Sequence, residues 1–537
     1  MKGNMMSWGL TIPKLIEHAE KYFCDNTYVS RSSDGAIQTY KYGDSLKNSK
    51  KLAGFLRSNL DIALSDRVAT IAWNDAAHFE TYFAACGMGA VLHTINPRLF
   101  PEQLIYIINH AEDKVLFVDP MFLPLIEGVY KKLYKEIPII VFTTDQVTSE
   151  IIKNIYSYGD ILASDVASID WVNLDEDSAA SLCYTSGTTG NPKGVMYSHK
   201  STVLHTWAAA NSIGATSQSS ILPVVPMFHV NAWGTPYIAL LTGVKLLLPG
   251  PALDGASLHE LIKKESPNIL MGVPTVWLGL LNYLSENDLK LSGVEQVMVG
   301  GSAAPYAMIK DFNEKHDIFL THGWGMTEMS PLGTMMQPTP KLLSLDKKER
   351  YEMQTRQGYP LFGVEIKTVD EKGNELPRDG NANGALKVRG PWIMDSYYKD
   401  DAKAVDDEGW FDTGDVATIF PDGCMQIVDR AKDVIKSGGE WISSIDLENA
   451  AVGYPEVQEA CVVGVPHPKW DERPLLLVVA DESTLNKDDL LKHLESKVAK
   501  WWLPDDIICV RDLPHGATGK LLKVELRAQY KNYLMEK

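Results

Sequence analysis

Short apolar segments alternate with helix-like segments between Asp66 and about Gly250. RVATIAW, which begins at Arg67, precedes the helix-like HFETYFAACGMGA and then VLHTI; further on, QLIYIINHA precedes KVLFV. This alternation is typical of βαβ units, in which crossover helices join parallel strands. We therefore expect an α/β fold, with a large N-terminal domain of mixed or parallel sheets flanked by helices.

The pattern of expected strands and helices changes twice towards the C-terminus. With 537 residues the chain is too long for one ordinary domain. From Gly384 the strands become shorter, as in GALKVRGP and PDGCMQIVDR, and after Arg430 an apolar run, PLLLVVA, precedes a helix-like LNKDDLLKHLESKVAKWW with its leucines on one face. We predict an N-terminal domain over residues 1–430 and a small, mobile α+β domain over residues 431–537.

The charge balance and the cysteines exclude several classes of partner. A formal net charge of -18 argues against a nucleic acid or an anionic membrane as partner. The six cysteines lie far apart without a CxxC pair, which favours buried free thiols over disulfides or zinc ligands.

One hydrophobic tract, ILPVVPMFHVNAWGTPYIALLTGVKLLLP from Ile221, is long enough to suggest a membrane span. Its three prolines before Leu240, together with His229 and Asn231, favour buried strands and loops instead. The N-terminus also has no long apolar core typical of a secretion signal. We expect a cytoplasmic enzyme with no integral membrane segment.

A glycine-rich stretch, YTSGTTGNPKGVMYSH, begins at Tyr184 between an apolar strand pattern at Ala179–Tyr184 and a helix pattern, SHKSTVLHTWAAAN. Glycines let backbone N–H groups approach an anion, hydroxyls add donors, and Lys193 adds a positive charge, so polyphosphate is the expected ligand. A Walker P-loop would need glycine directly before its lysine, but Pro192 occupies that position. A flexible linker is the alternative.

Together with later motifs in the same order, this stretch resembles the signature of the adenylate-forming superfamily, which contains acyl-CoA synthetases, firefly-type luciferases and the adenylation domains of peptide synthetases. The resemblance runs through nearly the whole chain. It implies that ATP phosphates bind at Lys193 and at Thr185, Ser186, Gly187, Thr188, Thr189 and Gly190, with Thr185 also near Mg²⁺.

THGWGMTEMSP carries the next matching positions. The resemblance implies that Trp324 stacks near adenine, Thr327 contacts the α-phosphate and Glu328 binds Mg²⁺, which prefers oxygen ligands. It also assigns nucleotide binding to Gly323, Gly325 and Met326, and to the loop Gly301, Ser302 and Ala303. A plain surface turn is the alternative for this segment.

Asp415 in WFDTGDVATI and Arg430 in VDRAKD match the pair that holds the ribose hydroxyls in similar enzymes. A turn aspartate paired with an arginine is the simpler alternative. Lys520 in LPHGATGKLLK matches the catalytic lysine of adenylation, although His515 and Gly516 depart from the usual pattern, and a solvated lysine is the alternative.

The resemblance also implies a second half-reaction with coenzyme A. Lys432 matches the hinge residue about which the small domain rotates, and Lys436 lies on the face presented for thioester formation. CoA binding is implied at Gly438, Gly439, Glu440 and Trp441, where the two glycines would leave room for a pantetheine arm.

The acyl pocket is expected at His229 and Trp233, for which plain core packing is the alternative. The segments PMFHVNAWGTPY and KSGGEWISSIDLEN resemble those of medium- and long-chain fatty acyl-CoA synthetases, but methylmercaptopropionate-CoA ligases share both segments. The chain length of the acid therefore stays open.

The predicted reaction couples a carboxylic acid to ATP, giving acyl-AMP and pyrophosphate, and then transfers the acyl group to coenzyme A, giving acyl-CoA and AMP. ATP and Mg²⁺ are the expected cofactors and CoA a substrate; a homodimer is left open. A carrier-dependent peptide-synthetase module, a luciferase-like oxygenase and a non-catalytic nucleotide-binding protein are the alternatives. The short sequence after Lys520 weakens the first, and the presence of Glu328 and Lys520 weakens the last.

Overall fold

The computed structural model describes residues 3–185, 191–438, 440–516 and 520–535. The chain divides into two compact units whose segments alternate in sequence. Unit 1 comprises Met1–Gln296, Gly325–Leu332 and Gly390–Ala404, and unit 2 comprises Val297–Trp324, Gly333–Arg389 and Val405–Lys537.

The first sheet of unit 1 has seven strands, in the spatial order β7 (Ile155–Ser157), β6 (Ile139–Val141), β5 (Val115–Val118), β3 (Arg67–Ile71), β4 (Val91–Thr94), β8 (Ala179–Tyr184) and β9 (Gly194–Ser198). All neighbours are parallel except β8 and β9. The central strands β3, β4 and β5 are mostly apolar and, apart from Arg67 at the start of β3, buried, as expected for parallel strands covered on both faces.

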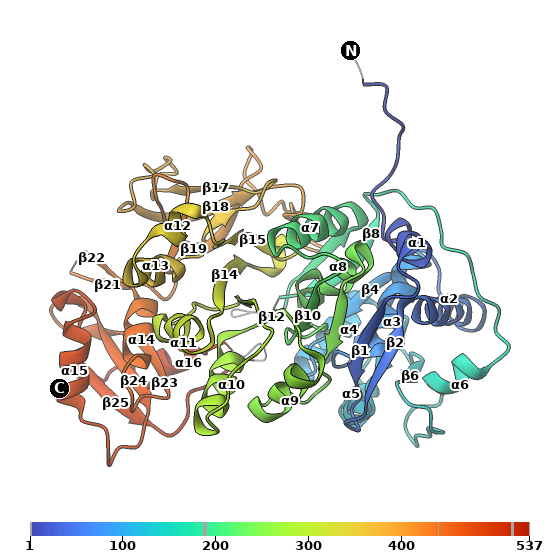
Figure 1. The fold of residues 1–537 in the computed structure, drawn as a ribbon, viewed down its shortest axis with the longest axis horizontal. Coiled ribbons are helices and arrows are strands. Elements are labelled where there is room, and N and C mark those ends of the chain that lie inside the picture. The colour runs from blue at the N-terminus through green and yellow to red at the C-terminus, as the bar shows by residue number, and fades with distance from the viewer. Residues whose placement is uncertain (1–2, 186–190, 439, 517–519, 536–537) are drawn as a thin grey trace. The chain divides into compact units, whose positions relative to one another are not determined.

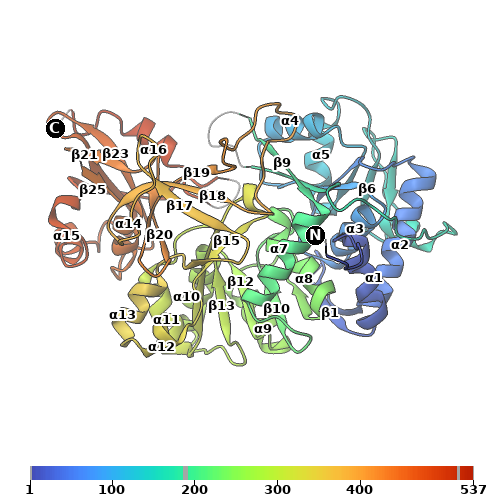
Figure 2. The same cartoon turned by 90° about the horizontal axis from the view of Figure 1, so that it is seen from above.

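The second sheet of unit 1 has the order β12 (Ile269–Gly272), β10 (Ser220–Pro223), β11 (Lys245–Leu248), β1 (Thr27–Arg31) and β2 (Ile37–Lys41), with only the β1–β2 pair antiparallel. Its helices and those of the first sheet are α1 (Ile12–Tyr22), α2 (Tyr42–Asn59), α3 (Ala76–Gly87), α4 (Pro101–Ala111), α5 (Leu123–Tyr130), α6 (Tyr158–Ala163), α7 (His199–Ser212), α8 (Thr235–Thr242), α9 (Gly255–Glu265) and α10 (Pro274–Glu286). Helices α1, α7 and α8 lie side by side (Figures 1 and 2). The predicted strand–helix alternation is confirmed.

The hydrophobic tract that begins at Ile221 contains a helix that we did not predict. After β10 the chain forms the short turn η2 (Val230–Gly234) and then α8, before β11. The prolines misled the prediction because Pro236 lies in the first turn of α8, where a missing N–H costs nothing, and Gly243 ends the helix in the left-handed conformation. Among the described helices, none is both long enough and apolar enough to cross a membrane.

The first part of unit 2 contains two sheets. One has the order β16 (Tyr359–Pro360), β15 (Leu332–Met335), β14 (Phe319–Gly325) and β13 (Gln296–Val299), with helices α11 (Tyr306–His316), α12 (Pro340–Ser344) and α13 (Lys347–Gln354). The other is a four-stranded antiparallel sheet of β17 (Glu365–Val369), β18 (Asn383–Arg389), β19 (Phe411–Ile419) and β20 (Met425–Arg430) (gold to orange in Figure 1). The predicted region of strands and turns after Gly384 is present, but the prediction of shorter strands is wrong: β18, β19 and β20 have 7, 9 and 6 residues, against 5, 4 and 4 in β3, β4 and β5. Antiparallel pairing to two neighbours extends these strands beyond their short apolar runs.

The C-terminal part of unit 2 is α+β, as predicted. Its sheet contains β22 (Glu440–Ile442), β21 (Ile435–Ser437), β24 (Asp471–Val479), β23 (Glu459–His467) and β25 (Asp506–Val510), with helices α14 (Ser444–Val452), α15 (Lys487–Glu495) and α16 (Lys523–Gln529). Alternate residues of β23 and β24 supply two cores, one with α14 and α15 and one with α16. Helix α15 is shorter than its sequence pattern because the chain turns after Glu495 into the short η4 (Lys500–Trp502).

Candidate functional site

The described ends of the glycine-rich stretch are held together by backbone and hydroxyl groups. Thr185 N–H donates to the Lys193 carbonyl (2.9 Å), and Lys193 N–H donates to Thr185 Oγ1 (3.2 Å). The structure adds strand β9 between this stretch and α7, so the stretch joins the antiparallel strands β8 and β9 rather than leading directly into a helix. The predicted phosphate-binding residues Ser186, Gly187, Thr188, Thr189 and Gly190 lie outside the described residues.

Glu328 and Lys193, the predicted metal ligand and phosphate cation, share a neighbour within unit 1. Glu328 lies buried in the short turn η3 (Thr327–Met329), and its Oε1 accepts a hydrogen bond from the Tyr397 hydroxyl (3.0 Å). The Lys193 ammonium lies 4.5 Å from the centre of the Tyr397 ring. The structure thus assigns Tyr397, which the sequence patterns did not single out, to the surroundings of both residues.

The backbone of the same turn is fixed by two further hydrogen bonds. The Tyr197 hydroxyl of β9 donates to the Thr327 carbonyl (2.6 Å), and Met394 N–H donates to the Glu328 carbonyl (3.0 Å). Thr327 and Glu328 are therefore held from β9 and from the segment that carries Tyr397. Fixing the backbone in this way holds the side chains of the turn in place, as a ligand-binding group requires.

The oxygen groups present at this turn fit Mg²⁺. Mg²⁺ is usually held by one or two carboxylates together with substrate phosphates, rather than by a complete cage of protein ligands. Glu328 supplies one buried carboxylate, and no group of three or more His, Cys, Asp or Glu side chains suited to a metal occurs among the described residues. A metal here would thus be shared with a phosphate ligand.

Asp415, Arg430 and Trp324 meet within unit 2. Asp415 and Arg430 are register partners on β19 and β20, and Arg430 Nε lies 2.9 Å from Asp415 Oδ1. The Trp324 indole N–H donates to the other oxygen, Oδ2 (3.0 Å). Burial raises the pKa of the Asp415 carboxyl, whereas Arg430, the Trp324 N–H and the positive charge of Lys520 act in the opposite direction. The structure brings these four predicted residues together.

The predicted adenine loop follows β13. Gly301 has a φ of +83°, Gly301 and Ser302 are exposed, and Ala303 is partly buried. His322, which precedes Gly323 on β14, pairs its Nδ1 with the Thr355 carbonyl (2.9 Å), and burial lowers the pKa of this histidine to about 4.

The segment that carries His229 and Trp233 has an unusual backbone. Val230, Asn231, Ala232 and Trp233 have φ between 41° and 55°, and Gly234 has 83°, so a full left-handed turn is formed. Such a conformation is costly for residues other than glycine and persists only where the surroundings enforce it. His229 and Trp233 are both partly buried, which leaves them accessible to a ligand.

Asn231 anchors this turn to β8. Its amide donates to Ser181 Oγ (3.0 Å), and its Oδ1 lies 3.4 Å from the Tyr82 hydroxyl. At the other end, a Cβ on Gly234 would lie 3.2 Å from the ring of His205. Asn231 is not among the predicted pocket residues; the ease with which asparagine adopts a positive φ, compared with most residues other than glycine, is the signal that could have identified it.

The predicted CoA-facing residues lie near the start of the C-terminal sheet. Lys432 and Lys436 are exposed, and Lys436 N–H donates to Glu472 Oε2 (3.0 Å). Gly438 has a φ of +59°, and a Cβ there would lie 3.1 Å from Trp470 and 3.3 Å from Trp501. Trp441 is partly buried; Gly439 and the side chain of Glu440 lie outside the described residues.

Lys520 is exposed, whereas the side chain of its neighbour Lys523 is largely buried, with 11% of its surface accessible. Lys523 Nζ forms an ion pair with Glu448 (2.7 Å) and donates to Ser444 Oγ (2.5 Å), so the base of the Lys520 loop is tied to α14. Sequence reasoning missed Lys523 because a lysine three residues from another gives no signal of burial.

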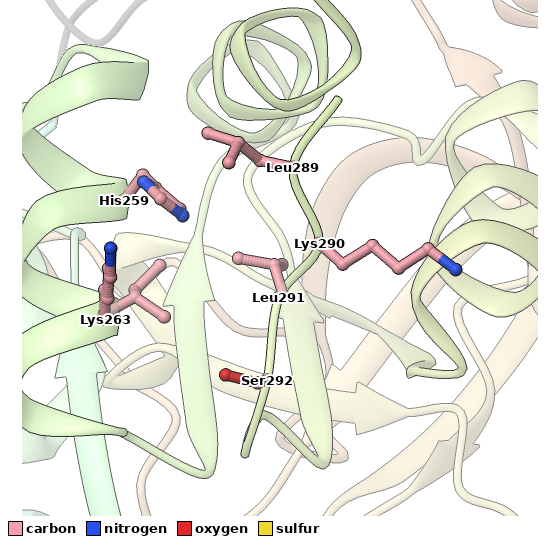
Figure 3. A pocket seen from close by; sticks show the side chains of 7 residues that line it. His259, Lys263, Leu289, Lys290, Leu291 and Ser292 are labelled. Carbon is pink, nitrogen blue, oxygen red and sulfur yellow. The ribbon is translucent and has the colours of Figure 1, made fainter. Parts of the chain in front are cut away.

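A separate hollow of about 180 Å³ lies on unit 1 between α9 and the segment after α10 (Figure 3). Its lining consists of His259, Ile262, Lys263, Leu289, Lys290, Leu291 and Ser292. None of the predicted site residues belongs to it.

The chain belongs to the AMP-binding enzyme family, whose model matches residues 16–398, and the model of the AMP-binding enzyme C-terminal domain matches residues 446–520. Among its relatives is a 3-methylmercaptopropionyl-CoA ligase of Ruegeria pomeroyi, 47% identical over 99% of this chain and 100% of the relative. A medium-chain-fatty-acid–CoA ligase of Ectopseudomonas oleovorans is 46% identical over 100% and 98%, and a long-chain-fatty-acid–CoA ligase of Thermus thermophilus is 43% identical over 98% and 97%.

Solved structures share the fold. An anthranilate CoA ligase in complex with anthranoyl-AMP matches with a TM-score of 0.87 at 23% identity, covering 100% of both chains. The O-succinylbenzoate coenzyme A synthetase of Bacillus subtilis, in complex with ATP and magnesium ion, matches with 0.79 at 22% identity, covering 96% of this chain and 98% of the other.

The chain is therefore an AMP-forming acyl-CoA ligase, an acid–thiol ligase that uses ATP, a carboxylic acid and CoA. The predicted superfamily, fold class and reaction class are confirmed. The acid, the metal and the roles of individual residues stay predictions.

Proposed function

We propose that this ligase activates an unbranched, largely apolar carboxylic acid, a medium- or long-chain fatty acid in the first instance. The observation that carries this proposal is that the side-chain amide of Asn231 is already hydrogen-bonded within the protein. Because Asn231 already bonds to Ser181 and lies near Tyr82, it has little capacity left to recognise a polar group on the acid. Of the turn's apolar side chains, that of Trp233 is partly exposed, whereas those of Val230 and Ala232 are buried, at 4% and 0% exposure.

The second candidate substrate is 3-methylmercaptopropionate. The Ruegeria relatives named for that acid are 47% and 46% identical to this chain, and the medium-chain relative is 46% identical, so identity does not separate the two. A thioether is weakly polar and polarisable and suits the same apolar surroundings.

For the first half-reaction we propose that two lysines of the chain, and a Mg²⁺ held by one carboxylate, offset the negative charge of the acid and the ATP phosphates. The carboxylate of the acid attacks the α-phosphorus of ATP and pyrophosphate leaves, so two anions must be brought together. Lys193 and Lys520 would offset this charge, and Thr327 would contact the α-phosphate. Glu328, with Thr185, would hold a Mg²⁺ that neutralises phosphate charge when bound. Asp415 and Arg430 would hold the ribose hydroxyls.

For the second half-reaction we propose that residues 431–537 form a mobile domain that turns about Lys432. Lys436 and the strand pair around Gly438 and Trp441 would then face the thiol of CoA. The left-handed φ of Gly438 and its packing against Trp470 and Trp501 support a backbone surface without a side chain at that point. We further propose a cytoplasmic location and leave a homodimer as an open alternative.

The test is an ATP- and CoA-dependent assay of AMP and acyl-CoA formation against straight-chain acids from propionate to palmitate, together with 3-methylmercaptopropionate. We expect the highest kcat/KM with a medium- or long-chain acid. A maximum at 3-methylmercaptopropionate would select the second candidate. Preference for an amino acid or a dicarboxylic acid would contradict the proposal, because the described turn provides no charged partner for them.

A further inference from the structure

We propose that Tyr397 is a positioning residue for the metal-bound nucleotide: its hydroxyl holds one oxygen of Glu328 so that the other would be available to Mg²⁺, and its ring holds the ammonium of Lys193. This inference rests on the proposed function, in which Glu328 and Lys193 serve the phosphates of ATP.

The segment that carries Tyr397 is attached to the chain on both sides of that residue. Met394 N–H donates to the Glu328 carbonyl (3.0 Å), and Tyr398 N–H donates to the carbonyl of Gly194 (2.8 Å), which directly follows Lys193. Tyr397 thus lies between two backbone bonds, one to the turn with the carboxylate and one to the strand next to the cation. Its position relative to both is set by the backbone.

The hydroxyl of Tyr397 suits the orientation of a metal-binding carboxylate. It donates to Glu328 Oε1 at 3.0 Å, and the structure gives the Glu328 carboxylate no other side-chain hydrogen bond among the described residues. A neutral donor fixes the carboxylate without cancelling its charge, whereas a lysine in its place would compete with the metal. The second oxygen keeps its capacity for Mg²⁺.

The ring of Tyr397 suits the orientation of Lys193. An ammonium over an aromatic face is attracted by the ring quadrupole, and the distance to the ring centre here is 4.5 Å. This contact restrains a flexible side chain but does not neutralise its charge, so Lys193 stays available to a phosphate. One side chain thereby sets the separation between a cation and an anion that must contact the same ligand.

The test compares ATP binding with and without Mg²⁺, measured by titration calorimetry with MgATP and with ATP in a chelator. The variant Tyr397→Phe keeps the ring and removes the hydroxyl. Because loss of such a supporting hydrogen bond commonly costs roughly 10–100-fold in metal affinity, we expect MgATP affinity to fall by about that factor while the affinity for metal-free ATP is unchanged. Tyr397→Leu, which removes the ring as well, should also weaken metal-free ATP.

The matched control is Tyr398→Phe, which removes a hydroxyl from the neighbouring residue and should leave both affinities unchanged. Equal binding of MgATP by Tyr397→Phe and the wild type would overturn the inference, as would an equal loss with and without Mg²⁺, because a merely structural role predicts that result. Should Tyr397→Leu fail to fold, Tyr397→Phe alone decides. If the wild type shows the expected Mg²⁺ pattern but activates none of the acids, the proposed substrate class fails and the inference stands.

Discussion

Two buried carboxylates of this chain, Glu328 in unit 1 and Asp415 in unit 2, have opposite surroundings. Asp415 is 3% exposed and has an arginine on one oxygen and an indole N–H on the other. Glu328 is 7% exposed, but among the described residues its one side-chain hydrogen-bond partner is a neutral hydroxyl. Across the described residues, no Lys, Arg or His nitrogen lies within 4.0 Å of the Glu328 carboxylate.

The difference indicates what each carboxylate binds. A buried charge is tolerated when it is paired or when it coordinates a metal. Asp415 has its counter-charge within the chain, so it can accept hydrogen bonds from uncharged hydroxyls such as those of ribose. Glu328 has no ion-pair partner among the described residues, so a cation that arrives with a ligand would complete its surroundings. The comparison therefore supports the proposal that Glu328 holds the cation of MgATP.

The largest expected effect concerns the cations near Asp415. Lys520→Ala removes a positive charge that acts on Asp415 and that we assign to the acid and the α-phosphate. Adenylation, measured as pyrophosphate exchange, should fall by roughly 10²–10³, by analogy with loss of a directed donor to a developing charge. Thioester formation from supplied acyl-adenylate and CoA should be retained. An equal loss in both half-reactions would contradict the assignment.

The comparison itself is tested by removing each negative charge. Glu328→Gln should lower the affinity for MgATP by roughly 10–100-fold and leave metal-free ATP unaffected. Asp415→Asn should lower both affinities by a similar factor, roughly tenfold, because the ribose contacts do not involve the metal. Calorimetric titrations with and without a chelator measure both. If the two variants show the same dependence on Mg²⁺, the two carboxylates do not differ in the way that we infer.

His205 gives a test based on pH. Its Nε2 accepts a hydrogen bond from Leu332 N–H (3.2 Å), four residues after Glu328, and burial lowers the pKa of His205 to about 3. Because the ordinary histidine pKa is about 6.5, the unfolded chain binds the proton more readily between these values, and the unfolding free energy should fall as the pH falls from about 6.5 towards 3.

The matched variant His205→Gln keeps an acceptor but cannot titrate in this range. Its unfolding free energy, from urea titrations between pH 6 and pH 4, should fall less steeply than that of the wild type, by up to about 1.4 kcal/mol per pH unit. Identical slopes would show that His205 is not held neutral, and the region around Glu328 would then contain a cation after all.

The smallest expected effect is at Trp324. Trp324→Phe keeps the ring and removes the N–H that donates to Asp415. A net hydrogen bond contributes about 1 kcal/mol, so ATP affinity should fall about fivefold, equally with and without Mg²⁺. Trp207→Phe, at an exposed tryptophan of α7, is the control. A loss that appears only with Mg²⁺ would contradict the inference that Asp415 binds the ribose and Glu328 the metal.

Much of the fold could be predicted because its signals are local. The apolar runs of β3, β4 and β5 and the helices between them follow from residue type and spacing. Strand β9 was missed because GVMYS is short and directly follows the glycine-rich stretch, and α8 was missed because two of the prolines precede it and the third occupies its first turn. In both cases the three-dimensional pairing, rather than the local pattern, decides the structure.

The site divides in the same way. Glu328, Asp415, Arg430 and Lys520 were found because they lie in motifs with a recognisable order, and the structure brings three of them together around Asp415. Tyr397, Asn231 and Lys523 were not found, because their contacts lie 69, 50 and 79 residues away in the chain. No local pattern in DSYYKD indicates that one tyrosine will contact both Glu328 and Lys193.

The most direct test of this account is a pyrophosphate-exchange assay of the wild type with a medium-chain acid and ATP, in the absence of CoA and with Mg²⁺ titrated from zero. We expect exchange that needs the acid and Mg²⁺ but not CoA, and that a chelator abolishes. Exchange that needs CoA would contradict an acyl-adenylate intermediate. Exchange that continues at the same rate in the chelator would contradict a site in which Glu328 depends on a bound metal for its counter-charge.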